Sequence, residues 1–542
     1  MAPQSNRIDL AQTPQQAARF LLQATPGATH GDIHALTGQP YAAWLDAQMA
    51  RPVAASHFDW LLASGYGAEE FRNSFAGLDA TLWRALIGGT DGLRQRVALA
   101  LSEIFVVSAL GISGAPWRAF CVANYVDLLT THAFGNYRTL IEAITRSTAM
   151  GIYLTYRGSS RADPATGSQP DENYARELLQ LFSIGLVELE MDGTPVQVDG
   201  APVETYDQAD IAGLARVFTG WDLDRSGLTT PLPADVHRRP MSNVRRRYET
   251  GEKRFLGTVI ASGVDADTAL DIALDAIFHH PNVPPFIGRQ LIQRFVTSNP
   301  SPAYVAAVAG AFNNNGAGVR GDMKAVLKAV LLNPEARTTS DRSGKIREPV
   351  LRLSALLRGF GYASDSGRYR VGNTDNAGSS LGQTAMRSPS VFNFYRPGYV
   401  APGTQAAAAG LVAPEMALAQ ETTAAGYVNY VRDGISSGFG ASATVTVNGV
   451  QVTRRDLQPG FSAELALADK PADLVQQVGD KLMQGGMPDA LKTEIVTAVG
   501  AITIPALNST GSNQAQIDTA KRTRVNAAVF LTMVSPEFQV QK

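Results

Sequence analysis

Apolar residues recur at helical spacing through most of this 542-residue chain, and that periodicity restricts the fold more than any other feature. The pattern covers residues 15–49, 78–150, 207–218, 265–332, 348–360, 414–433 and 472–533 with short interruptions. Side chains three and four positions apart share one face of an α-helix, so the pattern predicts amphipathic helices packed on a common core. We therefore expect a mainly α fold, a multi-helix array.

Two short stretches depart from the helical pattern and predict small β-hairpin insertions. Residues 444–453 alternate around Asn448-Gly449, a pair that suits the tight turn of a two-residue hairpin. Residues 187–204 contain Asp192-Gly193 and Asp199-Gly200 beside alternating valines, which indicates a second hairpin.

The length allows two or three domain-sized units, and composition divides the chain into three regions. We expect an N-terminal helical region at 1–160 and a helical core with a mixed-charge insertion at 161–360. Residues 361–542 hold a long Gly-, Pro- and Ser-rich loop, a hairpin and C-terminal helices. We expect the three to form one continuous domain, with the loop packed on the surface.

Charge and cysteine content exclude several classes of protein. A net charge of −2 gives no basis for nucleic-acid binding. A single cysteine, Cys121, excludes an internal disulfide. The longest apolar run, Val97–Ser113, is interrupted by Glu103 and predicts a buried helix, so we expect no transmembrane segment. Residues 1–7 lack the apolar core of a signal peptide, which indicates a cytoplasmic protein or a trimmed form of an exported one.

Motifs for known cofactors are incomplete. Glycines do not form a phosphate-binding or dinucleotide-binding loop, so the cofactor stays unknown. Asp222 and Asp224 open a stretch similar to a calcium loop, but Pro233 stands where its final glutamate belongs. These two aspartates are the candidates for a divalent cation site.

The stretch from Asp171 to Trp221 carries the most distinctive pattern. Asn173, Glu177 and Gln180 lie at i, i+4 and i+7 of a predicted helix and share one polar stripe, with Arg176 beside it. Such a stripe can be a solvated face, a buried hydrogen-bond network or an active site.

This stretch resembles the hallmark of a bacterial family known only as domain of unknown function 1800. The resemblance covers nearly the whole chain. Its pieces are Glu172–Leu178, Leu181–Gly185, Tyr206, Asp210-Ile211, Ala215-Arg216 and Thr219–Trp221, then Ala24–Thr29, Gly251–Gly257, Phe286–Leu291, Arg294–Val296, Arg347–Pro349, Pro389–Tyr395 and Ser535–Phe538.

The resemblance implies no settled activity. Members of the family are often exported and often occur beside a protein with a sulfatase-like fold, which implies a periplasmic or secreted location and such a partner. Family members frequently have His-Asp where this chain has Tyr248-Glu249, so a role that depends on that histidine does not transfer.

Two functional hypotheses follow. The first is a non-catalytic scaffold or binding partner at the cell surface or in the periplasm, of unknown oligomeric state. The second is an enzyme acting on an anionic or polymeric extracellular substrate, and the sequence does not decide between them. The site of such an enzyme would use Glu177 and Asn173 as catalytic groups. Arg176, Lys253 and Arg289 would hold the anion, and Trp221 would form an aromatic wall. A buried ion-pair network is the structural alternative for the same residues.

Overall fold

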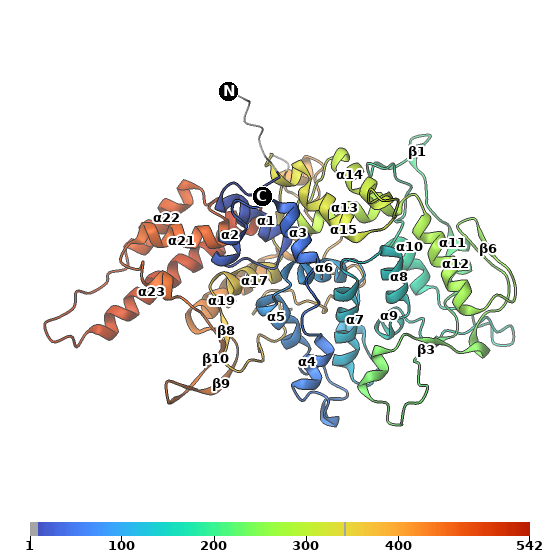
Figure 1. Ribbon diagram of the computed structural model, residues 1–542, viewed down its shortest axis with the longest axis horizontal. Helices are drawn as coiled ribbons and strands as arrows, with labels where there is room; N and C mark the ends of the chain where they lie inside the picture. The colour runs from blue at the N-terminus through green and yellow to red at the C-terminus, as the bar shows by residue number, and fades with distance from the viewer. Residues whose placement is uncertain (1–8, 341–342) are drawn as a thin grey trace.

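A computed structural model, which describes residues 9–340 and 343–542, confirms the predicted mainly α fold (Figure 1). Residues 1–7, examined above for a signal peptide, lie outside the described part. The sheets in the described part have only two or three strands. None of the described helices has the length and apolar character needed to cross a membrane.

The N-terminal third forms the centre of the molecule (Figure 1). Its helices are α1 (Pro14–Ala24), α2 (His30–Leu36), α3 (Tyr41–Met49), α4 (His57–Ala63), α5 (Leu78–Gly88), α6 (Gly92–Ser102), α7 (Arg118–His132), α8 (Tyr137–Thr145) and α9 (Thr148–Tyr153). Side-chain caps mark several of the starts, as at Thr13 and Ser56, each of which accepts a hydrogen bond from a backbone N–H of the first turn. Every residue of α6 is buried, so this helix is an axis of the core.

The middle third lies beside and above that centre (Figure 1). Its helices are α10 (Asn173–Gln180), α11 (Gln208–Ala215), α12 (Ala266–His279), α13 (Val283–Phe295), α14 (Pro302–Asn313), α15 (Met323–Leu332) and α16 (Pro334–Arg337). Short strand pairs join them: β1 (Gln197–Val198) with β2 (Ala201–Pro202), β3 (Trp221–Asp222) with β4 (Ser242–Asn243), and β5 (Lys253–Phe255) with β6 (Thr258–Ile260).

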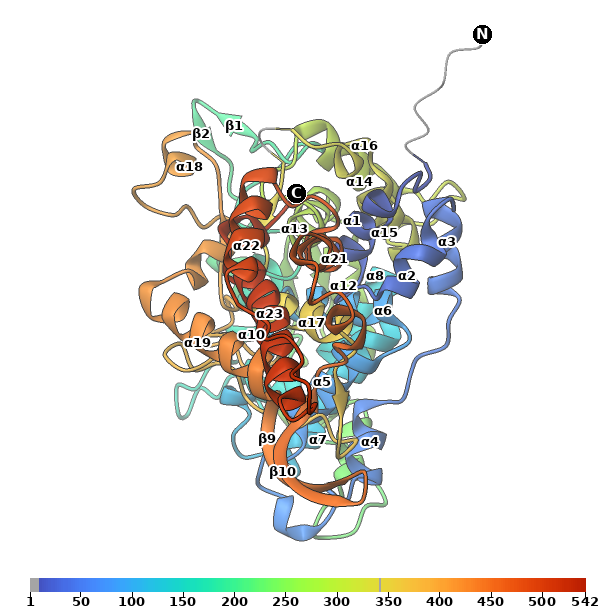
Figure 2. The ribbon, with the colours of Figure 1, turned by 90° about the vertical axis from the view of Figure 1, so that its left-hand side faces the viewer.

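The C-terminal third lies on the opposite side (Figure 1). Its helices are α17 (Pro349–Gly359), α18 (Gln405–Ala408), α19 (Glu421–Ser437), α20 (Ser462–Leu465), α21 (Pro471–Met483), α22 (Asp489–Gly500), α23 (Gln514–Val534) and α24 (Pro536–Gln539). Helices α21, α22 and α23 pack against one another, and Figure 2 views them from their outer side. The last strand, β11 (Val540–Gln541), returns to pair with β7 (Lys345–Ile346).

Both predicted hairpins are present. β9 (Phe439–Val447) and β10 (Val450–Gln458) pair around Asn448-Gly449, where both residues have the positive φ that this turn requires. β8 (Ala363–Ser364) adds a third strand to this sheet. The 187–204 insertion pairs over fewer residues, through β1, β2 and isolated bridges at Val187–Glu204 and Leu189–Pro195.

The sequence predicts that the long loop, residues 363–410, packs on the surface. The structure differs, because part of this loop is buried. Thr374, Leu381, Gln383 and Thr384 are buried. The Thr374 hydroxyl donates to the Gln383 carbonyl, and the Thr374 N–H donates to the Thr384 hydroxyl, so side chains satisfy the backbone that water would otherwise solvate. This loop therefore passes through the interior and reaches the cleft described below.

Buried apolar side chains form two clusters. The larger one joins helices of the N-terminal and middle thirds. The smaller one centres on α17, α19, α21 and α23, and it takes in Trp83, Leu86, Ile87 and Leu99 from α5 and α6. The N-terminal third therefore contributes to both cores.

Candidate functional site

Helix α10 presents the polar stripe predicted from the sequence, but its members have different surroundings. Asp171 caps the helix by accepting a hydrogen bond from the Asn173 N–H at 2.8 Å. Arg176 is half exposed and forms an ion pair with Glu172 one turn earlier, at 3.0 Å. Asn173 is partly buried, and its amide donates to the Thr155 hydroxyl at 3.5 Å. These two members of the stripe are thus held by local contacts.

Glu177 is the buried member of the stripe, with 7% of its surface exposed. Its Oε2 has no hydrogen-bond partner among the described residues. Burial raises the pKa of Glu177, and the charge of Arg176 offsets only part of this rise. Burial also raises the pKa of Tyr206 to about 12, and the nearby Glu177 carboxylate adds to this rise. Glu177 therefore sits beside a phenol in a partly dehydrated environment.

The remaining predicted site residues lie in other surroundings. Lys253 is 0% exposed, donates to the Gly251 carbonyl at 3.1 Å and lies over the Tyr248 ring. Trp221 is buried, and the Arg146 guanidinium lies over its ring at 4.8 Å. No hydrogen bond or ion pair in the described part of the chain joins Glu177 to Lys253 or Arg289. The contacts of Lys253 and Trp221 are thus with other residues.

Asp222 and Asp224 each have a cationic partner. Asp222 pairs with Arg247 at 3.0 Å, and Asp224 pairs with Arg239 at 3.5 Å. No group of three or more His, Cys, Asp or Glu side chains able to hold a metal ion occurs within residues 9–340 and 343–542. The two aspartates are thus neutralised by arginines that follow them in the mixed-charge insertion.

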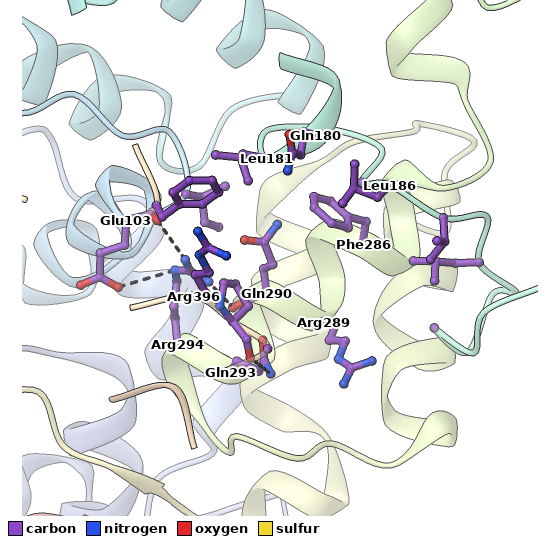
Figure 3. A pocket seen from close by; sticks show the side chains of 18 of the residues that line it. Glu103, Gln180, Leu181, Leu186, Phe286, Arg289, Gln290, Gln293, Arg294 and Arg396 are labelled. Atoms are coloured by element: carbon purple, nitrogen blue, oxygen red, sulfur yellow. Dashed lines mark hydrogen bonds and ion pairs between the residues drawn. The ribbon is translucent and has the colours of Figure 1, made fainter. Parts of the chain in front are cut away.

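Arg289 lies instead in a cleft of about 480 Å³ between α10, α13 and the long loop (Figure 3). A volume of this size fits a small-molecule ligand. The described lining residues are Glu103, Ile104, Gln180, Leu181, Gly185, Leu186, Val187, Leu189, Gly193, Pro195, Phe286, Arg289, Gln290, Gln293, Arg294, Val391, Phe392, Tyr395, Arg396, Pro397 and Gly398. The walls are mainly apolar, and three arginines but only one carboxyl group line them.

One face of α13 forms the side of this cleft. Phe286, Gln290 and Gln293 are spaced so that they project in the same direction from the helix (Figure 3). Opposite them, Gly185 has a positive φ of 76°, and a Cβ there would lie 2.7 Å from the Phe286 ring. Glycine is therefore required at residue 185 for the Phe286 wall to stand where it does.

A buried asparagine before α13 fixes the opposite wall. The Asn282 amide donates to the carbonyls of Ile184 and Val187, at 2.9 and 2.7 Å. Its oxygen accepts from the Leu189 N–H at 2.9 Å. Three hydrogen bonds to one side chain hold residues 184–189 against the start of α13, so the width of the cleft is set by the fold.

The floor of the cleft is a buried cluster of charges. Arg294 lies 3.5 Å from the Glu103 carboxylate, and the Tyr395 hydroxyl donates to the same oxygen at 3.3 Å. Below them, Lys345 pairs with Glu415 at 2.9 Å and lies 3.9 Å from Glu348. Buried charges of this kind require partners, and most of these have them.

The carboxyl groups of Glu103 and Glu348 influence each other's pKa in this cluster. The Oε1 atoms of both have no other hydrogen-bond partner among the described residues. Burial and the neighbouring Glu348 carboxylate raise the pKa of Glu103 well above its ordinary value. Burial opposes ionisation of Glu348 as well, but Lys345 and the hydrogen bond from Glu103 outweigh it and lower the pKa of Glu348 to about 2. Of the two carboxyl groups, Glu103 is thus the one that holds a proton more tightly.

Two amide atoms of α13 in the cleft wall have no hydrogen-bond partner among the described residues. Gln290 and Gln293 are 6% and 4% exposed. The Gln293 amide nitrogen donates to the carbonyls of Ser298 and Pro397, but its Oε1 accepts no hydrogen bond. The Gln290 Nε2 likewise has no acceptor. The two amides of α13 therefore offer one free donor and one free acceptor, both desolvated, in addition to the Glu103 Oε1 and Arg294 Nε on the floor, which also lack hydrogen-bond partners among the described residues.

Sequence reasoning found Arg289 but missed the floor of the cleft. The available signal was Glu103, the charge that interrupts the longest apolar run. Arg294, Glu348 and Tyr395 also lie in segments that carry the family resemblance, about 50 residues apart or more. Only the fold shows that these segments meet.

The fold and site define a mainly helical protein with a preformed ligand-sized cleft above a buried charge cluster. The chain belongs to the family described as "Protein of unknown function (DUF1800)", whose sequence model matches residues 19–540. No curated protein and no solved structure matches the chain.

Proposed function

We propose that the cleft binds a ligand with an apolar body and at least one anionic group. The observation that carries this proposal is the pair Arg289 and Arg396, which are exposed at the cleft and have no acidic partner among the described residues. Guanidinium groups bind carboxylates and phosphates through paired hydrogen bonds. Phe286 and Phe392 supply apolar surface beside them, and Arg396 lies over the Phe392 ring at 4.0 Å.

The protonation of Glu103 favours an anion in this cleft. The raised pKa of Glu103, the one carboxyl group among the described lining residues, favours its neutral form beside three arginines. Arg294 belongs to the floor, and its charge adds to the attraction of the two exposed arginines. An anion that enters would lose water but gain these cations in surroundings of reduced dielectric constant.

Probe binding tests the proposal. An anionic aromatic probe, anilinonaphthalene sulfonate, and a neutral analogue, phenylnaphthylamine, are titrated by fluorescence into the full chain. We expect Arg289→Gln with Arg396→Gln to weaken the anionic probe on the order of tenfold per arginine and to leave the neutral one unchanged. The matched control replaces two exposed arginines outside the cleft, Arg245→Gln with Arg246→Gln. Equal loss in both double variants, or no loss in either, would contradict the proposal.

An enzyme with Glu177 as acid or base is a second candidate. Its support is the buried Glu177 Oε2 without a partner, next to Tyr206, whose hydroxyl also has none among the described residues. In that reading Asn173 assists, and Arg176, Lys253 and Arg289 hold an anionic or polymeric substrate. A Glu177→Gln variant that folds normally and retains every activity found for the wild type would remove this candidate.

The scaffold role, export to the periplasm or cell surface and a sulfatase-like partner stay proposals that depend on the family resemblance. Copurification of the chain with a co-expressed neighbouring sulfatase-like protein tests them. A protein that stays monomeric and captures no partner in that experiment would count against the scaffold.

A further inference from the structure

We infer that the ligand of the cleft contains an amide group close to its anionic group, as in an N-acylated amino acid or the carboxyl-terminal end of an apolar peptide. The inference rests on the proposed function, because it places the anionic group on a cleft arginine, Arg396. It adds the chemistry of the next group along the ligand.

The free donor and acceptor in the cleft match one amide. A ligand carbonyl would accept from the Gln290 Nε2, and a ligand N–H would donate to the Gln293 Oε1. Both side chains are more than nine-tenths buried and lie one turn apart on α13. A buried polar atom without a partner costs free energy, so a ligand that pairs with both gains affinity and is selected for that arrangement.

The position of Gln290 agrees with this arrangement. Figure 3 shows its amide projecting into the cleft between Arg396 and Phe286. A ligand that spans from Arg396 past Gln290 to Phe286 therefore meets a cation, an amide and an aromatic ring in that order. This is the order of carboxylate, amide and apolar chain in an acylated amino acid.

The apolar walls argue against a sugar acid. A sugar ring would bring several hydroxyl groups against Leu186, Val187, Leu189 and Phe286, where carbon surface offers them no hydrogen bonds. An acyl chain or aliphatic side chain instead buries apolar surface there.

The experiment compares ligands that differ by one group, with calorimetry on the full chain. N-octanoyl-leucine carries the amide and the carboxylate, and its ester analogue replaces the N–H by oxygen. We expect the amide compound to bind about tenfold more tightly than the ester, because the ester leaves the Gln293 oxygen unpaired. We expect Gln290→Met to weaken N-octanoyl-leucine about tenfold, whereas the exposed control Gln516→Met leaves its affinity unchanged.

The outcomes separate this inference from the proposed function. Equal affinity for amide and ester, or tighter binding of glucuronate than of N-octanoyl-leucine, would overturn the inference and leave the anion requirement intact. Equal affinity for N-octanoyl-leucine and its neutral C-terminal amide would overturn the proposed function itself. If an Ala-Leu-Ala-Leu peptide binds more tightly than N-octanoyl-leucine, the ligand is the carboxyl-terminal end of a polypeptide. If N-octanoyl-leucine binds more tightly, the ligand is a free acylated amino acid.

Discussion

At the scale of single residues, the buried ionisable groups are the most informative part of this protein. Glu103 faces Arg96 of α6, Arg294 of α13, Glu348 at the start of α17, and Tyr395 of the long loop. A carboxyl group this deep is held in one protonation state by its neighbours and not by the solvent.

The protonation of Glu103 can be observed directly. We expect an infrared band of a protonated carboxyl group at neutral pH that is lost in Glu103→Gln. The control is Asp456→Asn, because hydrogen bonds from Arg370, Ser366 and Ser364 outweigh burial and lower the pKa of that carboxyl. An unchanged band in Glu103→Gln would show that the proton is elsewhere.

A buried histidine should make the fold sensitive to mild acid. Burial lowers the pKa of His237 to about 4, although its ring nitrogen lies 2.6 Å from the Pro116 carbonyl. The unfolded value is about 6.5, so the unfolded chain binds the proton more readily and stability falls as the pH drops from 6.5 towards 4. Between about pH 7 and pH 5 we expect the wild type to lose on the order of 2 kcal/mol more unfolding free energy than His237→Gln in urea titrations. The exposed His279→Gln should behave like the wild type; equal slopes in all three proteins would contradict this assignment.

Local residue contacts were readable from the sequence, and distant ones were not. The Asn448-Gly449 turn and the Arg176–Glu172 pair involve residues at most four positions apart, and periodicity covers that range. Glu103 and Tyr395 are 292 positions apart, so no local pattern indicates their contact. Lys253 was expected to hold an anion because its charge was visible in the sequence, whereas its burial beside Tyr248 was not.

At the scale of elements, close backbone packing limits which residues a helix can carry. Helix α11 lies directly on β5, and a Cβ at Gly213 would lie 1.7 Å from the Arg254 carbonyl oxygen. The approach of these two elements thus depends on the absence of a side chain at residue 213.

Gly213→Ala should therefore separate α11 from β5. We expect a loss of about 1–3 kcal/mol in unfolding free energy, measured by urea or thermal denaturation. Gly310→Ala on α14 is the matched control, because a Cβ there meets no described atom within 4 Å, and it should stabilise the protein by about 0.5–1 kcal/mol. A neutral Gly213→Ala would mean that the two elements do not pack this closely.

At the scale of the whole molecule, the two cores are not independent. The Trp83 indole donates to the Gly372 carbonyl at 3.1 Å, and Trp83, Leu86 and Leu99 belong to the smaller, mainly C-terminal core. The three regions expected from the sequence stay a prediction, and so does their union into one domain. Side chains of the N-terminal third that belong to the C-terminal core favour a single domain.

A fragment that ends at residue 340 tests whether the three regions form one domain. The fragment lacks Lys345, Glu348 and Tyr395 and leaves Trp83 without its core. We expect it to show no cooperative thermal transition at the melting temperature of the full chain and no binding of the anionic probe. A fragment that melts like the full chain would instead establish an independent N-terminal domain.

The span of the cleft also has a consequence for synthesis on the ribosome. Its lining begins at Glu103 and ends at Gly398, so the site cannot close until that segment has left the exit tunnel. Closing a loop of this length costs entropy that only the finished contacts repay. A ligand therefore cannot assist folding of the growing chain before residue 398 has emerged.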